Sequence, residues 1–134
     1  AEVQVKHLND ALEASFEALD LLAESEAAER GGLHEMIGYL YLQSQGMLEQ
    51  AIEQYDEAIR LKRLVGDGRG ASRAQFHLAV ALFLISQFEK SRRYGEAALA
   101  GFEALGLEGL AEAVKVRRFL EKFPQPAPQA GEES

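Results

Sequence analysis

The chain has 134 residues and a formal net charge of −8, so its length fits a single domain. It contains no Cys, which excludes a disulfide framework, thiolate metal sites and Cys nucleophiles. Leu and Ala (19 and 21) far outnumber Val and Ile (ten together), a composition that favours helices and excludes a sheet protein.

Apolar residues recur at spacings of three and four between glycine-rich breaks, which predicts helices over residues 3–29, 32–44, 47–65, 70–85, 87–105 and 109–122. The first segment is acidic, because residues 1–30 hold eight acids and two bases, whereas residues 31–123 hold twelve of each. With no basic face, nucleic-acid binding is excluded. Ser86 with Glu89 predicts a capping box, and Gly66 and Gly106 predict left-handed helix ends.

A period of 40 residues relates the middle of the chain to itself. Leu48 matches Phe88, Ala58 matches Ala98, and Gly66 matches Gly106. Small residues also return every seven positions in three successive segments, as Ala11/Ala18, Ala51/Ala58 and Ser91/Ala98. Small residues on successive turns let a neighbouring helix approach closely, so the pattern predicts a stack of antiparallel helix pairs.

These residues resemble the tetratricopeptide repeat, in its subclass with a period of about 40 residues. One repeat shows Ile37-Gly38, Tyr41, Gly46, Leu48, Ala51, Tyr55 and Ala58, and the next shows Leu78-Ala79, Leu82, Ser86, Phe88, Ser91 and Ala98. Gly95 stands where the second repeat should carry an aromatic residue, and we expect Tyr94 to fill that space. The resemblance implies an all-α, right-handed solenoid of antiparallel pairs, with about six helices.

Only two repeats are complete, which divides the chain into five parts. We expect an acidic helix or cap over 1–30, repeats over 31–68 and 69–108, a capping helix over 109–123 and a flexible Pro-rich tail over 124–134. In the capping helix, Leu110, Val114 and Leu120, with Ala113, are expected to face inward. The first helix also carries a short heptad pattern, so it packs either on the solenoid or in a coiled coil.

No catalytic or metal-binding pattern survives inspection. His34-Glu35 starts like a zinc-protease motif, but Gly38 stands where the second His is needed. The glycine run at 66–70 lacks the Lys and Ser or Thr of a phosphate-binding loop. We therefore predict no enzymatic activity, no cofactor and no metal.

The resemblance places ligands on a concave face lined by the first helix of each repeat. Carried over, this implies partner-binding positions at Glu35, Met36, Tyr39, Leu42 and Gln43, and at Arg73, Phe76, His77, Val80, Phe83 and Leu84. Residues 78–85 are apolar all round. Three kinds of contact are considered for this apolar surface: neighbouring helices of the same chain, a partner peptide or helix, and a second copy of the chain. A homodimer is favoured slightly over a monomer.

We thus expect a non-enzymatic protein-protein interaction module, a scaffold or regulatory domain that binds a partner or itself through an apolar concave face. The alternative is a sensory receptor domain that binds a small peptide or metabolite, anchored by His77, Arg73 and Glu35, and regulates an attached effector. The longest apolar run is residues 78–85, too short to span a bilayer, and no signal peptide is visible. We therefore expect no membrane association and a cytoplasmic location.

Overall fold

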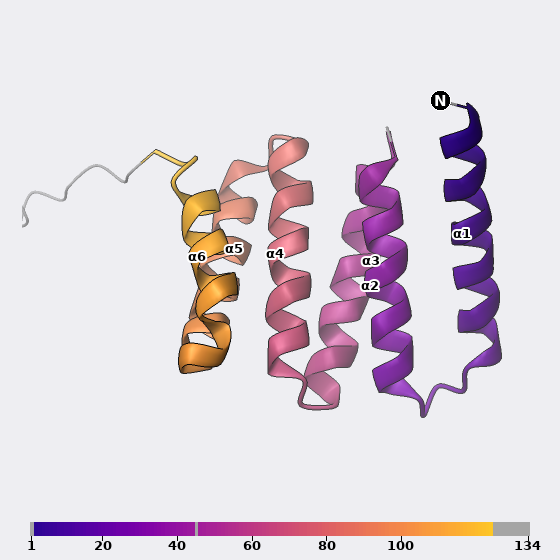
Figure 1. Ribbon diagram of the computed structural model, residues 1–134, viewed down its shortest axis with the longest axis horizontal. Helices are drawn as coiled ribbons and strands as arrows, with labels where there is room; N and C mark the ends of the chain where they lie inside the picture. The colour runs from indigo at the N-terminus through magenta and orange to yellow at the C-terminus, as the bar shows by residue number, and fades with distance from the viewer. Residues whose placement is uncertain (1, 45, 125–134) are drawn as a thin grey trace, which may run out of the picture.

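A computed structural model of the protein describes residues 2–44 and 46–124 and shows helices set side by side in a row (Figure 1). The described residues form six α-helices and one 3₁₀ turn, which confirms the all-α solenoid of helix pairs. The elements are α1 (Glu2–Leu21), α2 (Ala27–Gln43), α3 (Leu48–Leu64), α4 (Gly68–Leu84), α5 (Phe88–Glu103), η1 (Gly106–Gly109) and α6 (Leu110–Leu120). None of these helices is long and apolar enough to cross a membrane.

The single helix predicted over 3–29 is wrong, because α1 ends at Leu21 and α2 already begins at Ala27. Gly31 and Gly32 do not break a helix but lie inside α2. A Cβ added to Gly31 would lie 3.3 Å from Leu61 Cβ on α3, so this glycine allows a close helix crossing.

The turn between α1 and α2 is held by a side chain from the second helix. Arg30 Nη1 donates to the carbonyls of Leu19 and Leu22, at 3.2 Å each. The last carbonyls of a helix lack partners within the helix, so this guanidinium supplies donors where they are needed. The division of the chain at residues 30 and 31 remains a prediction.

Left-handed residues end the helices at regular intervals. Gly66 and Gly106 have φ of +76° and +64°, as predicted, and Gly46 has +78°. The capping box at Ser86 is wrong: Ser86 itself has φ +64°, and the cap of α5 is Gln87, without a side-chain hydrogen bond. Gln87 N donates to Leu82 O at 2.9 Å, which closes the end of α4.

The core repeats with the sequence. Ala51, Tyr55 and Ala58 of α3 are fully buried and pack in one cluster with Leu78 of α4. The Tyr55 ring lies against Gly38 of α2, where an added Cβ would meet ring atoms at 3.1 Å. Large and small residues thus alternate across the helix pair, as the repeat requires.

Two of the four residues predicted to face inward from the capping helix α6 do so: Ala113 is buried and Leu120 packs against the core. Leu110 and Val114 face outward instead, at 49% and 38% exposed, contrary to the prediction. Val116 and Phe119 are buried in their place, Val116 in a cluster with Ala98 and Phe102 of α5 and Phe119 in a cluster with Ala79 of α4, and this packing sets the orientation of α6.

The space beside Gly95 is filled from α6. An added Cβ at Gly95 would lie 2.9 Å from Leu120 Cδ2. Tyr94 packs both against the cluster around Leu78 and, together with Leu120, against the cluster of Ala79, Phe119 and Phe123. Tyr94 therefore shares this part of the core with Leu120 and does not fill it alone. Of the predicted tail, only Pro124 is described, and residues 125–134 lie outside the described residues.

Candidate functional site

The side chains predicted for the concave face come from α2 and α4, which lie next to each other in the row (Figure 1). They differ widely in exposure. Met36, Tyr39 and Leu84 are 54%, 49% and 56% exposed. Gln43 and Arg73 are also exposed, and the half-buried members of the set are Glu35, Leu42, Phe76, His77, Val80 and Phe83.

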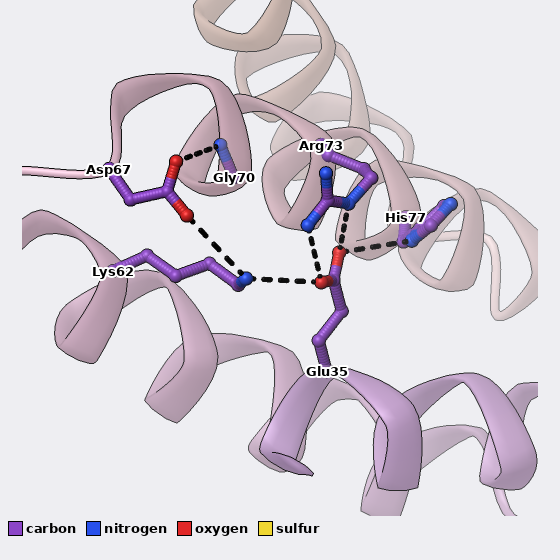
Figure 2. Close-up of polar contacts among 6 residues, drawn as sticks. All are labelled: Glu35, Lys62, Asp67, Gly70, Arg73 and His77. Carbon is purple, nitrogen blue, oxygen red and sulfur yellow. Dashed lines mark hydrogen bonds and ion pairs between the residues drawn. The ribbon is translucent and has the colours of Figure 1, made fainter. Parts of the chain in front are cut away.

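A polar network joins three of the predicted residues (Figure 2). Arg73 donates from Nε and Nη2 to the two carboxylate oxygens of Glu35, both at 2.9 Å. His77 Nδ1 lies 3.8 Å from Glu35 Oε2. Because Glu35 belongs to α2 and the other two to α4, the network holds the first helices of successive repeats together.

Lys62 is the member of this network that sequence reasoning missed. Its Nζ lies 3.2 Å from Glu35 Oε1 and 3.9 Å from Asp67 Oδ2, and its side chain is only 6% exposed. Asp67 also accepts a 2.8 Å hydrogen bond from Gly70 N and so caps α4. Helical periodicity gives no signal for a buried Lys, since this residue type is almost always exposed unless it is paired.

The charges of the network determine the protonation of Glu35. Burial alone would raise the pKa of this carboxyl, but the hydrogen bonds and charge of Arg73, together with Lys62, hold it below its usual range. Glu35 is therefore a carboxylate at neutral pH. It neutralises a lysine that would otherwise be buried without a counter-charge.

His77 has the opposite electrostatic balance. Burial lowers its pKa, and the nearby Glu35 carboxylate, which favours the charged ring, does not fully compensate. The imidazole is thus neutral at pH 7. Its ring also lies against its aromatic neighbours, with centroid distances of 5.6 Å to Tyr55 and 6.1 Å to Tyr39.

The apolar side of α4 is covered by aromatic residues of α6 and of the segment directly after it. Ring centroids lie 5.6 Å apart for Phe76 and Phe119, and 5.8 Å apart for Phe83 and Phe119. Phe123 adds a third contact, 5.6 Å from Phe83. Of the three kinds of contact considered for this helix, neighbouring helices of the same chain therefore account for Phe76 and Phe83.

The exposed large apolar side chains next to the polar network lie on α2, whereas Arg73 and Leu84 are the exposed members of the set on α4. Met36 and Tyr39 are one helical turn apart, and both are about half exposed. Tyr39 lies against His77 and so borders the polar network, whereas Met36 Sδ accepts a hydrogen bond from Ser15 Oγ of α1 at 3.7 Å. Together Met36, Tyr39, Arg73 and His77 form what we call the concave patch.

Two hollows lie away from this patch. Gln43 lines one of about 880 Å³ between α1 and α2, together with Leu8 and Met47. The other, of about 400 Å³, lies between α3, α4 and α5 and is lined in part by Asp56 and Tyr94. Gln43 is thus separate from the other predicted residues.

The three histidines serve different local roles. His34 is buried and its Nδ1 lies 2.7 Å from Gln54 Oε1, His77 lies beside Glu35, and His7 is exposed on α1. Within residues 2–44 and 46–124, no three His, Asp or Glu side chains come together in a group able to hold a metal ion.

Comparison with known proteins gives one match. The family model described as tetratricopeptide repeat matches residues 29–104, which include α2 to α5 almost entirely. Neither a curated protein nor a solved structure matches the chain.

Proposed function

Since the chain belongs to the tetratricopeptide repeat family, a family of protein-interaction scaffolds, we propose that it binds a segment of a partner protein on the concave patch. The segment is a peptide or helix that places an apolar side chain over Met36 and Tyr39. The chain acts by binding and not by catalysis.

The exposure of Met36 and Tyr39 carries this proposal. Leaving large apolar side chains in water forgoes about 1.5 to 3 kcal/mol each relative to full burial. Both are about half exposed, at 54% and 49%, so a partner that covers them recovers part of that free energy. Met adapts to varied partners and Tyr adds a polar tip, which suits both residues to an interface.

The polar network supports this reading over a receptor for a small metabolite. Glu35, Arg73 and His77 would be the anchors of such a receptor, but Glu35 already accepts both hydrogen bonds from Arg73. Glu35 and Arg73 are thus engaged with each other and position α2 against α4, whereas the buried Nδ1 of His77 makes no hydrogen bond within the described part of the chain. Arg73 is 47% exposed at its side chain and remains reachable at the edge of the patch.

The test is to select peptides that bind the full chain from a random display library and to measure their affinity by calorimetry. The double variant Met36→Ser/Tyr39→Ser should weaken the selected peptides about 30-fold or more, because interface anchors typically contribute 2 kcal/mol or more. Leu64→Ser is the matched control, since Leu64 is 69% exposed at the end of α3, outside the patch.

Circular dichroism checks that all variants keep their helices. Equal affinity for wild type and the double variant would place the binding site elsewhere and refute the proposal. Loss of binding in the Leu64 control as well would point to nonspecific hydrophobic adhesion, which also contradicts it.

A further inference from the structure

Helices α1 and α6 lie at the two ends of the described row of helices (Figure 1). Between them the repeats pair α2 with α3 and α4 with α5. By its 40-residue match, α1 corresponds to α3, the second helix of its repeat. In chain order α6 follows a second helix and so takes the place of a first helix.

The face of α1 that a first helix would cover is open. Ala11 and Ala18 are the counterparts of Ala51 and Ala58, which are 0% exposed, yet both are partly exposed. On the same side of α1, Ala14 is exposed and Leu21 is 87% exposed. The opposite side of α1 is already used, because Leu12 and Leu19 pack against Ile37 of α2.

The outer face of α6 is open and apolar as well. Leu107, Leu110 and Val114 are 89%, 49% and 38% exposed. Their spacings of three and four place them on one side of the helix and the turn before it. The other side of α6 is buried against α5 through Ala113 and Val116.

The two end helices carry opposite charge. Helix α1 has five acids and one base, a net of −4, and α6 has one acid and three bases, a net of +2. In α6, Arg117 is paired with Glu103 of α5 at 2.7 Å. Lys115 and Arg118 make no ion pair within the described part of the chain and are exposed.

From these observations we propose that the open face of α6 is a docking site for α1 of a second copy of this chain. The two helices together form one composite repeat: Leu107, Leu110 and Val114 cover Ala14, Ala18 and Leu21 of the next copy. The acids beside the α1 face meet Lys115 and Arg118. Because the two faces differ, each bound copy leaves one face free, and the assembly grows head to tail. This contact is separate from the concave patch.

Sedimentation velocity of the full chain over a wide concentration range tests this. The expected result is a mass that rises with concentration beyond the dimer and falls with added salt, since the charges at the edge of the contact are screened. Val114→Glu on α6 and Ala14→Arg on α1 should each weaken self-association about 30-fold or more. Leu64→Glu, an exposed apolar position on α3, is the matched control and should not change it.

Mixing the two variants gives the decisive arm, because each keeps one intact face. The Ala14→Arg chain keeps an intact α6 face, and the Val114→Glu chain keeps an intact α1 face. These two faces bind each other, and both remaining faces are disrupted, so the mixture should form a one-to-one dimer and no larger assembly. A wild-type chain that stays monomeric, a mass that stops at the dimer, or growth unaffected by both substitutions would overturn the proposal. The double variant Lys115→Glu/Arg118→Glu changes only exposed charges of α6. It should also weaken self-association, which tests the proposal without altering an apolar residue.

Discussion

Replacing Glu35 with Gln removes the charge at the centre of the polar network while keeping the size of the side chain. Lys62 then keeps a side chain that is 6% exposed, with only Asp67 at 3.9 Å as a counter-charge. Breaking a buried ion pair, such as that of Glu35 with Lys62, costs about 3–5 kcal/mol of folding stability. The pair of Glu35 with the half-exposed Arg73 contributes less, about 0.2–1 kcal/mol.

The expected loss of stability is therefore about 2–3 kcal/mol, since the Gln oxygen still accepts a hydrogen bond and Asp67 retains part of the attraction. Urea unfolding followed by circular dichroism measures it as a lower midpoint with an unchanged slope. Glu57→Gln is the matched control: its partner Arg60 is 63% exposed, so the loss there should stay below about 0.5 kcal/mol.

A Glu35→Gln chain as stable as the Glu57→Gln chain would show that Lys62 is solvated and would refute the buried network. A further variant separates charge from packing. Glu35→Leu with Lys62→Met removes both charges and should recover most of the stability, because apolar pairs of similar volume often replace buried ion pairs without loss.

Three further predictions concern stability, each measured by urea unfolding. Phe119→Ala should cost about 3–5 kcal/mol, because Phe119 is 7% exposed and contacts both Phe76 and Phe83; a loss below about 1 kcal/mol would contradict the aromatic covering of α4. Ser86→Gly should stabilise the chain by about 1 kcal/mol, since φ is +64° there; destabilisation would contradict the left-handed assignment. Stability should fall as pH drops below 6.5, because unfolding lets His77 take up a proton that burial withholds in the folded chain, and His77→Gln should reduce this fall; an unchanged pH profile would contradict it.

The sequence predicted the helix pairs and the left-handed glycines because both depend on local rules. A small residue every seven positions marks a close helix contact wherever it occurs, and Gly66 and Gly106 end helices because they adopt positive φ at little cost. Ser86 takes the same conformation without being Gly. Because Ser commonly caps the start of a helix, the sequence wrongly predicted it to cap α5.

Other features depend on contacts between segments far apart in the sequence. Gly31 looked like a helix break, but it is a contact point with α3, and only the packed helices distinguish the two. The orientation of α6 follows from the packing of Val116 against α5 and of Phe119 against α4, which leaves Leu110 and Val114 facing outward.

The sequence predicted only part of the polar network. Glu35 and Arg73 carry opposite charges on the first helices of successive repeats, which is a usable signal for an ion pair. Lys62 gave no such signal, because its burial depends on how closely α3 approaches both first helices.

The central claim, that the concave patch binds a partner segment, is tested most directly by nuclear magnetic resonance with a library-selected peptide and the ¹⁵N-labelled chain. The account predicts that amide shifts concentrate around Met36, Tyr39 and Arg73 on α2 and α4. Shifts centred instead on the hollow between α3, α4 and α5, around Asp56 and Tyr94, would contradict it.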